Sequence, residues 1–133
     1  MKKAAINPAR SGIKVRGVDF FMFNVRNMKR AKKFYQGLFG LKKGGEFNDY
    51  WSEFATEPVV LALCGAGNRS KWFGPGAVAL AVDDVYKAVE VCRQHGAKIL
   101  AEPVTTSVCH MAFIADPDGN RICLHARKDG TAG

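Results

Sequence analysis

The sequence contains an internal repeat, and this repeat restricts the chain to a fold built from two similar modules. Residues 25–31 resemble residues 82–88, because in both an apolar strand end is followed by a polar residue and then by a helical pattern. A glycine closes each helical pattern, at Gly40 and at Gly96, as is common at the C-terminus of a helix. We therefore expect two successive copies of one structural unit.

Each half of the repeat contains one amphipathic helix. Asn27 and Asp84 precede the two helical patterns, and their short side chains can accept hydrogen bonds from the free amides of the first turn. Both residues are therefore predicted N-caps. The apolar positions at helical spacing are Met28, Ala31, Phe34, Tyr35 and Leu38 in the first helix, and Val85, Ala88, Val89 and Cys92 in the second.

Strands are expected before and after each helix, separated by turn residues such as those at 116–119. The expected strands are 18–25, 41–47, 50–55 and 59–64 in the first half, and 77–82, 97–100, 109–115 and 121–126 in the second. The pattern predicts the α+β class with two βαβββ modules in a single domain over 17–127. The expected parts are a basic N-terminal segment 1–16, modules 17–64 and 77–127, a linker 65–76 and a C-terminal tail 128–133.

The charge and the cysteines restrict the choice of partners and compartment. The net charge is +8, but no zinc finger, helix-turn-helix or aromatic RNA-binding motif accompanies the basic residues, so nucleic-acid binding is not favoured. No apolar run has the length of a membrane helix, and no secretory signal follows Met1, which predicts a cytosolic protein without a membrane partner. Four widely spaced cysteines without a C-x-x-C pair predict buried, reduced thiols.

Three motifs in order carry a resemblance to a known family. Phe34-Tyr35 with residues 38–41, the strand at 78–84, and the turn at 116–120 followed by an apolar strand are similar to motifs of the vicinal-oxygen-chelate (glyoxalase/bleomycin resistance/dioxygenase) superfamily. The resemblance covers about residues 17–127. It implies that each module curves into a half-barrel, that the half-barrels enclose a cavity, and that the protein forms a homodimer.

The same resemblance locates the positions where metal-dependent members carry their ligands, usually His or Glu. These positions correspond to Phe20, Ala62, Ala77 and Cys123. Phenylalanine and alanine cannot bind a metal, and one thiolate alone does not form a site. We therefore expect no metal and no other cofactor. An alternative metal site that uses His110, Cys123 and His125 has the right donor types, provided that the last two strands bring them together.

Strand alternation, with the family's inward positions as the register, predicts which side chains face the cavity. Phe21, Phe23, Met111 and Phe113 are expected to face the helices instead. The predicted ligand-binding residues are Phe20, Met22, Trp51, Glu53, Ala62, Ala77, His110, Arg121 and Cys123.

Glu53 and His110 are the candidate catalytic residues. Glu53 could act as a base or as a counter-charge for a cationic ligand, or it could be an edge carboxylate that is exposed or paired with a nearby Arg or Lys. His110 could exchange a proton or orient a ligand, or it could be a partly buried imidazole with its hydrogen bonds satisfied.

The small, mainly apolar lining favours a protein that binds a partly apolar organic molecule without the family's metal site. One alternative is a lyase, isomerase or dioxygenase that uses relocated ligands or a metal-independent acid/base pair. A second alternative is an interaction protein whose basic face docks on a polyanion.

Overall fold

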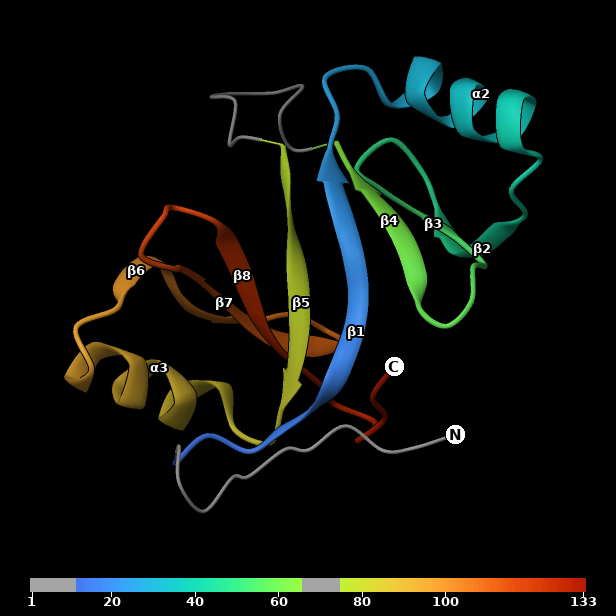
Figure 1. Cartoon of the computed structure of the whole chain (residues 1–133). Helices are drawn as coiled ribbons and strands as arrows, with labels where there is room; N and C mark the ends of the chain where they lie inside the picture. The colour runs from blue at the N-terminus through green and yellow to red at the C-terminus, as the bar shows by residue number, and fades with distance from the viewer. Residues whose placement is uncertain (1–11, 66–74) are drawn as a thin grey trace. The chain divides into compact units, whose positions relative to one another are not determined.

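The computed structural model describes residues 12–65 and 75–133, which form eight strands and two helices (Figure 1). They belong to two compact units: an N-terminal unit, Phe20–Val78, and a C-terminal unit, Met1–Asp19 with Ala79–Gly133. The element order confirms the predicted α+β class with two βαβββ modules. Most of the predicted N-terminal segment 1–16 and of the linker 65–76 lies outside the described residues.

The N-terminal unit has the strand order β2-β3-β4-β1, with the helix α2 (Met28–Phe39) packed against β4. Strand β4 runs parallel to β1 and antiparallel to β3, which in turn pairs with β2. Met28, Phe54 and Leu63 form the buried core between helix and strands. The strands are β1 (Val15–Asn24), β2 (Lys43–Phe47), β3 (Trp51–Phe54) and β4 (Val60–Cys64).

Both predicted N-caps are confirmed. The side chain of Asn27 accepts a hydrogen bond from the Arg30 amide at 2.9 Å, and Asp84 accepts one from the Lys87 amide at 3.0 Å. Gly40 ends α2 with φ of 64°, in the left-handed region that glycine adopts at no steric cost. Neither α2 nor α3, the helices of the described residues, has the length and apolar character needed to cross a bilayer.

The C-terminal unit has the strand order β5-β8-β7-β6. Its helix α3 (Val85–Gln94) packs on an aliphatic core that includes Val89, Ala112, Ile114 and Leu124. Strand β7 pairs antiparallel with both β6 and β8. The strands are β5 (Gly76–Val82), β6 (Lys98–Thr105), β7 (Cys109–Ala115) and β8 (Arg121–Arg127).

Strand β6 is longer than the sequence predicts. The prediction ended this strand at residue 100 because Pro103 is a strand breaker in the centre of a sheet. Here Pro103 lies in the edge strand of its unit, and the register with β7 shifts between Ala101 and Val104. A proline is tolerated at an edge or at an irregularity, because no ladder hydrogen bond is lost there.

The predicted face assignments in β7 are wrong. Ala112 and Ile114 belong to the core under α3, so strand alternation places Met111 and Phe113 on the opposite face of β7. The segment 109–115 is apolar at almost every position, and in such a strand an error of one residue exchanges the two faces. Phe21 and Phe23 pair with Leu61 and Leu63 on the helix-bearing face, as predicted, but both rings are exposed rather than covered by the helix.

Candidate functional site

Five of the predicted site residues share one face of the N-terminal unit. Met22 and Glu53 both pair with Ala62, and Trp51 pairs with Cys64, so alternation aligns these side chains with that of Phe20. Ser52 and Phe54 alternate with them, and Phe54 is in the core on the α2 side. We call the group Phe20, Met22, Trp51, Glu53 and Ala62 the Trp51 face.

Trp51 is held by two specific contacts on this face. Its ring meets the ring of Phe20 edge-to-face, with a centroid distance of 5.3 Å and an interplanar angle of 82°. Its indole Nε1–H donates a hydrogen bond of 2.7 Å to Oε2 of Glu53. Indole pairs a large apolar surface with a single donor, and here the donor is fixed by a carboxylate. The described structure thus bonds the carboxylate of Glu53 to tryptophan, a partner that none of the predicted alternatives for Glu53 included.

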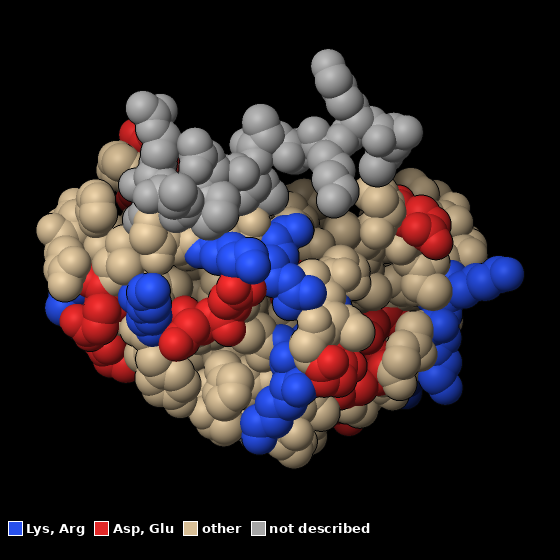
Figure 2. Space-filling view, turned by 90° about the horizontal axis from the view of Figure 1, so that it is seen from below, with Lys and Arg blue, Asp and Glu red and all other residues tan. Residues whose placement is uncertain are grey.

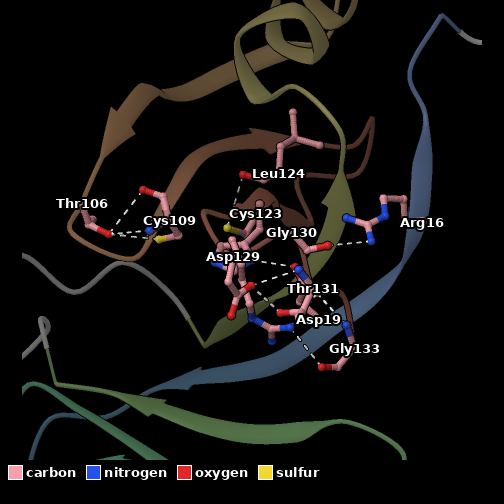
Figure 3. A network of polar contacts seen from close by, with 12 residues as sticks. Arg16, Asp19, Thr106, Cys109, Cys123, Leu124, Asp129, Gly130, Thr131 and Gly133 are labelled. Carbon is pink, nitrogen blue, oxygen red and sulfur yellow. Dashed lines mark hydrogen bonds and ion pairs between the residues drawn. The ribbon is translucent and has the colours of Figure 1, made fainter.

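The C-terminal unit contains a buried charge network that includes one residue of the predicted alternative metal site (Figure 3). Asp19 has an exposed fraction of 0%, and its Oδ2 accepts a hydrogen bond of 2.6 Å from Nδ1 of His125. Its Oδ1 accepts a hydrogen bond of 2.8 Å from the Gly133 amide and lies 3.4 Å from Nη1 of Arg127. Arg127 also donates to the Gly133 carbonyl at 3.1 Å. Three residues, His125, Arg127 and Gly133, thus surround the buried carboxylate of Asp19.

This arrangement determines the charge of Asp19. Burial alone raises the pKa of the carboxyl group, but the hydrogen bonds from His125 and Gly133 and the charge of Arg127 outweigh burial, so the pKa is lowered. Asp19 is therefore ionised at neutral pH. A buried carboxylate that accepts from Nδ1 fixes the tautomer and the orientation of an imidazole ring. His125 is itself buried, with an exposed fraction of 6%.

Cys123 occupies a family ligand position but lacks the properties of a ligand or a nucleophile. Its exposed fraction is 2%, and burial, together with the nearby Cys109 and Asp19, raises the pKa of its thiol to about 12. The thiol lies 3.8 Å from the Leu124 carbonyl, within reach of a weak S–H···O hydrogen bond. Since the thiolate is the reactive and metal-binding form, the raised pKa of Cys123 disfavours both roles at neutral pH.

His110 does not join this group. It pairs with Ala126 on the α3-bearing face of β7 and β8, whereas Cys123 and His125 point to the other face. Its ring contacts Tyr86 of α3 at 5.9 Å, and its Nδ1 lies 2.8 Å from the hydroxyl of Thr105. The predicted placement of His110 on the cavity side is thus corrected, and His110, Cys123 and His125 do not converge.

Ala77 and Arg121 complete the predicted set. Val82 of β5 faces the helix side, and Ala77 precedes it by five residues. An odd spacing in a strand places two side chains on opposite faces, so Ala77 points away from the helix side, as expected. Arg121 opens β8 and lines a hollow of about 820 Å³ in the C-terminal unit, together with His95, Lys98 and Asp118. This hollow lies at the β7–β8 turn.

Sequence reasoning missed Asp19, Arg127, Met111 and Phe113. A signal for Asp19 was present, because it is the one charged residue in the otherwise apolar segment 18–23. A buried carboxylate requires a partner. His125 and Arg127 are two residues apart near the end of β8, so their side chains lie on the same face, and both contact Asp19. The sequence alone does not identify His125 and Arg127 as the partners of Asp19, because strands β1 and β8 are far apart along the chain.

The residues at the family's metal-ligand positions do not fit a metal. Phe20, Ala62 and Ala77 have no donor atom, and Cys123 retains its proton. In residues 12–65 and 75–133, no three His, Cys, Asp or Glu side chains form a group suited to a metal ion.

The family sequence model of the Glyoxalase/Bleomycin resistance protein/Dioxygenase superfamily matches residues 17–124, and the chain belongs to this superfamily. The lactoylglutathione lyase of Escherichia coli O157:H7 is 31% identical over 126 residues, which cover 84% of this chain and 93% of that protein. The lactoylglutathione lyase of Neisseria meningitidis serogroup A is 29% identical and covers 82% and 89%.

A solved structure shows the same fold. The Mn(II)-bound glyoxalase from Novosphingobium aromaticivorans matches with a TM-score of 0.63 and 21% identity, over 91% of this chain and 41% of that one. This similarity supports the arrangement of strands and helices. It does not identify the chemistry of the site, which depends on the residues present there.

Proposed function

We propose that the protein binds a small, partly apolar organic molecule on the Trp51 face and does so without the metal site of its superfamily. The observation that carries the proposal is the hydrogen bond of 2.7 Å between Trp51 Nε1 and Glu53, beside the aromatic contact with Phe20. Half-buried Trp51 offers apolar contact area, with the buried side chains of Phe20 and Met22 behind it, and one carboxylate offers orientation. This combination is typical of small-molecule sites.

The proposal is tested by a thermal-shift screen of aromatic cations, aromatic acids and glycopeptide drugs. A ligand that binds only the folded protein raises the melting temperature with the logarithm of its concentration. Trp51→Ala should weaken the hits by about tenfold or more, because it removes a large contact surface. Tyr50→Ala, an exposed aromatic next to it in sequence, is the matched control. If every hit responds equally in Trp51→Ala and the parent, the Trp51 face is not the site.

Glu53→Gln separates the roles of the carboxylate. Loss of the cationic hits alone identifies Glu53 as a counter-charge. Unchanged binding with lost turnover of a hit identifies a base and supports an enzyme. Glutamine can still accept the hydrogen bond from Trp51, so the indole orientation is preserved.

A lyase is the second candidate, because the curated relatives described above are named lactoylglutathione lyases. In this reading, Asp19 and His125 supply a fixed carboxylate–imidazole pair for proton transfer. Conversion of lactoylglutathione, followed by mass spectrometry with and without added Mn²⁺, tests it. Turnover that disappears in Asp19→Asn, in a variant shown to be folded, favours the lyase. Turnover that requires Mn²⁺ contradicts metal-independent chemistry.

The homodimer and the cytosolic location remain predictions that follow from the family resemblance and the sequence. Light scattering across a range of protein concentrations tests the dimer. A monomer throughout that range contradicts it.

A further inference from the structure

The solvent-exposed side of α2 carries large apolar side chains that the core does not use. Phe34 and Leu38 have exposed fractions of 53% and 64%, and Phe39 next to them is also exposed. Arg30, Phe34 and Leu38 are spaced four residues apart, so they form one continuous row along the helix. Exposed apolar groups clustered in this way mark an interaction surface in soluble proteins.

The surroundings of this row are uniformly basic. No acidic residue occurs between Asp19 and Glu46, while this stretch contains Arg26, Lys29, Arg30, Lys32, Lys33, Lys42 and Lys43. Lys32 and Lys43 are directed to the ring of Phe47, at 4.5 and 5.5 Å. Lys29 and Lys33 form the row next to Arg30–Phe34–Leu38, and within the described residues no ion pair engages them.

Two exposed cations of the C-terminal unit are instead paired with acidic residues. Lys14 lies 3.5 Å from Asp83, and Arg93 lies 2.6 Å from Glu102 and 3.4 Å from Glu90. On the face drawn in Figure 2, basic and acidic side chains lie beside one another. Within residues 12–65 and 75–133, the stretch 26–43 has seven cations and no acidic residue, so unbalanced positive charge gathers around α2, where the exposed apolar row lies.

These observations select among partners. A second copy docked through α2 about a two-fold axis would bring two basic helices together, which is unfavourable. A helix surface with projecting rings and Leu38 also offers no groove for an acidic peptide. A lipid surface accepts inserted aromatic and aliphatic side chains at headgroup depth and attracts lysines when its headgroups are anionic.

We propose that α2 docks the protein on an anionic membrane surface, with Phe34, Leu38 and Phe39 inserted among the lipids and Lys29, Arg30 and Lys33 on the headgroups. Such docking needs no spanning helix. It departs from the sequence-based prediction of no membrane partner and does not depend on the ligand proposed for the Trp51 face.

Sedimentation of the full chain with vesicles tests the proposal. Vesicles of phosphatidylcholine with about 30% phosphatidylglycerol should bind the protein, and pure phosphatidylcholine should bind it at least about tenfold less, because basic residues near an anionic surface each add affinity. Binding to the anionic vesicles should fall as salt rises. No binding to the anionic vesicles at low salt overturns the proposal.

Two double variants and two controls assign the contact. Phe34→Ala with Leu38→Ala, and Lys29→Glu with Lys33→Glu, should each lower vesicle partitioning by about tenfold or more. Val104→Ala with Val108→Ala removes exposed apolar side chains elsewhere, and Lys98→Glu with Lys128→Glu makes the same charge change elsewhere. Both controls should bind like the parent. Circular dichroism establishes that each variant is folded.

Three outcomes contradict membrane docking through inserted side chains of α2. Equal losses in variants and controls indicate a nonspecific effect of charge or hydrophobicity. Unchanged partitioning in the Phe34/Leu38 variant indicates adsorption by charge alone. Tighter binding to a single-stranded RNA oligomer than to the vesicles, lost on charge reversal but kept in the Phe34/Leu38 variant, indicates a nucleic-acid surface instead.

Discussion

The N-terminal and C-terminal units repeat one strand–helix–strand pattern, but they fill their cores differently. Under α2 the buried residues are Met28, Phe54 and Leu63, with Tyr35 and Phe47 packed around them. Under α3 they are aliphatic or small, among them Val85, Ala88, Val89 and Leu124. An aromatic core concentrates much of its contact area in a few side chains, whereas the aliphatic core spreads it over many.

The two units differ even more on the faces away from their helices. The N-terminal unit has an indole bonded to a carboxylate there, and the C-terminal unit has a buried carboxylate bonded to an imidazole. Packing requires only that the core positions remain apolar and of suitable size. The other positions can change without loss of the fold, and function is determined there.

The largest expected effect tests the difference between the cores. Phe54→Ala should lower the free energy of unfolding by about 3–5 kcal/mol, because it leaves a large cavity in a core with few members. Val89→Ala should cost about 2 kcal/mol, since it removes two methyl groups from a core with many contacts. Urea unfolding followed by circular dichroism measures both. An equal or reversed order contradicts the comparison.

The next effect concerns thiol reactivity in the two units. Cys123 is buried, and its pKa is raised from 9.0 to about 12, so its thiolate fraction at pH 8 falls about a thousandfold. Cys64 in the N-terminal unit is half-buried. Iodoacetamide at pH 8, followed by peptide mass spectrometry, should modify Cys64 long before Cys123. The Cys64→Ser variant is the control. Rapid modification of Cys123 in folded protein would restore the possibility of a nucleophile.

The third effect tests the charge network of the C-terminal unit. Asp19→Asn removes a buried carboxylate that accepts from His125 and Gly133 and leaves half-buried Arg127 without its charged partner, so it should lower the free energy of unfolding by about 3 kcal/mol. The matched change Asp83→Asn removes an exposed pair with Lys14 and should cost less than about 0.5 kcal/mol. Urea unfolding at pH 7 compares the two. A similar, small cost for both contradicts the importance of the buried network.

The pH dependence of Asp19→Asn adds a second measurement. The pKa of Asp19 is lowered in the folded protein, so its contribution is complete above the ordinary value of 3.8 and is lost as the pH falls through the folded pKa. The stability difference between parent and variant should therefore shrink in acid below about pH 3.8. If the difference in unfolding free energy between parent and variant stays constant in acid, the destabilisation comes from altered packing and not from the charge of Asp19.

Much of the fold could be predicted from the sequence, because it depends on local signals. The helices follow from apolar spacing and from Asn27 and Asp84, whose capping hydrogen bonds form within three residues. The end of β6 was missed because the effect of Pro103 depends on whether its strand lies at an edge, which is a property of the sheet.

The site could be predicted only in part. The Trp51 face follows from alternation within strands where the period of two is clear. His110 was assigned to the wrong face because residues 109–115 are apolar on both sides. Asp19 and His125 are separated by 106 positions, and local pattern contains no information on such a pair.

The smallest expected effect concerns the exposed row on α2. Phe34 and Leu38 belong to the apolar positions predicted for the first amphipathic helix, yet both are exposed. Leu38→Ala should change the free energy of unfolding by less than about 0.5 kcal/mol, because little buried area is lost and alanine favours helix. Val89→Ala in α3 is the comparison, at about 2 kcal/mol. Urea unfolding is measured at two protein concentrations. A cost above about 1 kcal/mol that grows with concentration would show that a second copy covers this row, and it would contradict both its exposure and its docking on a membrane.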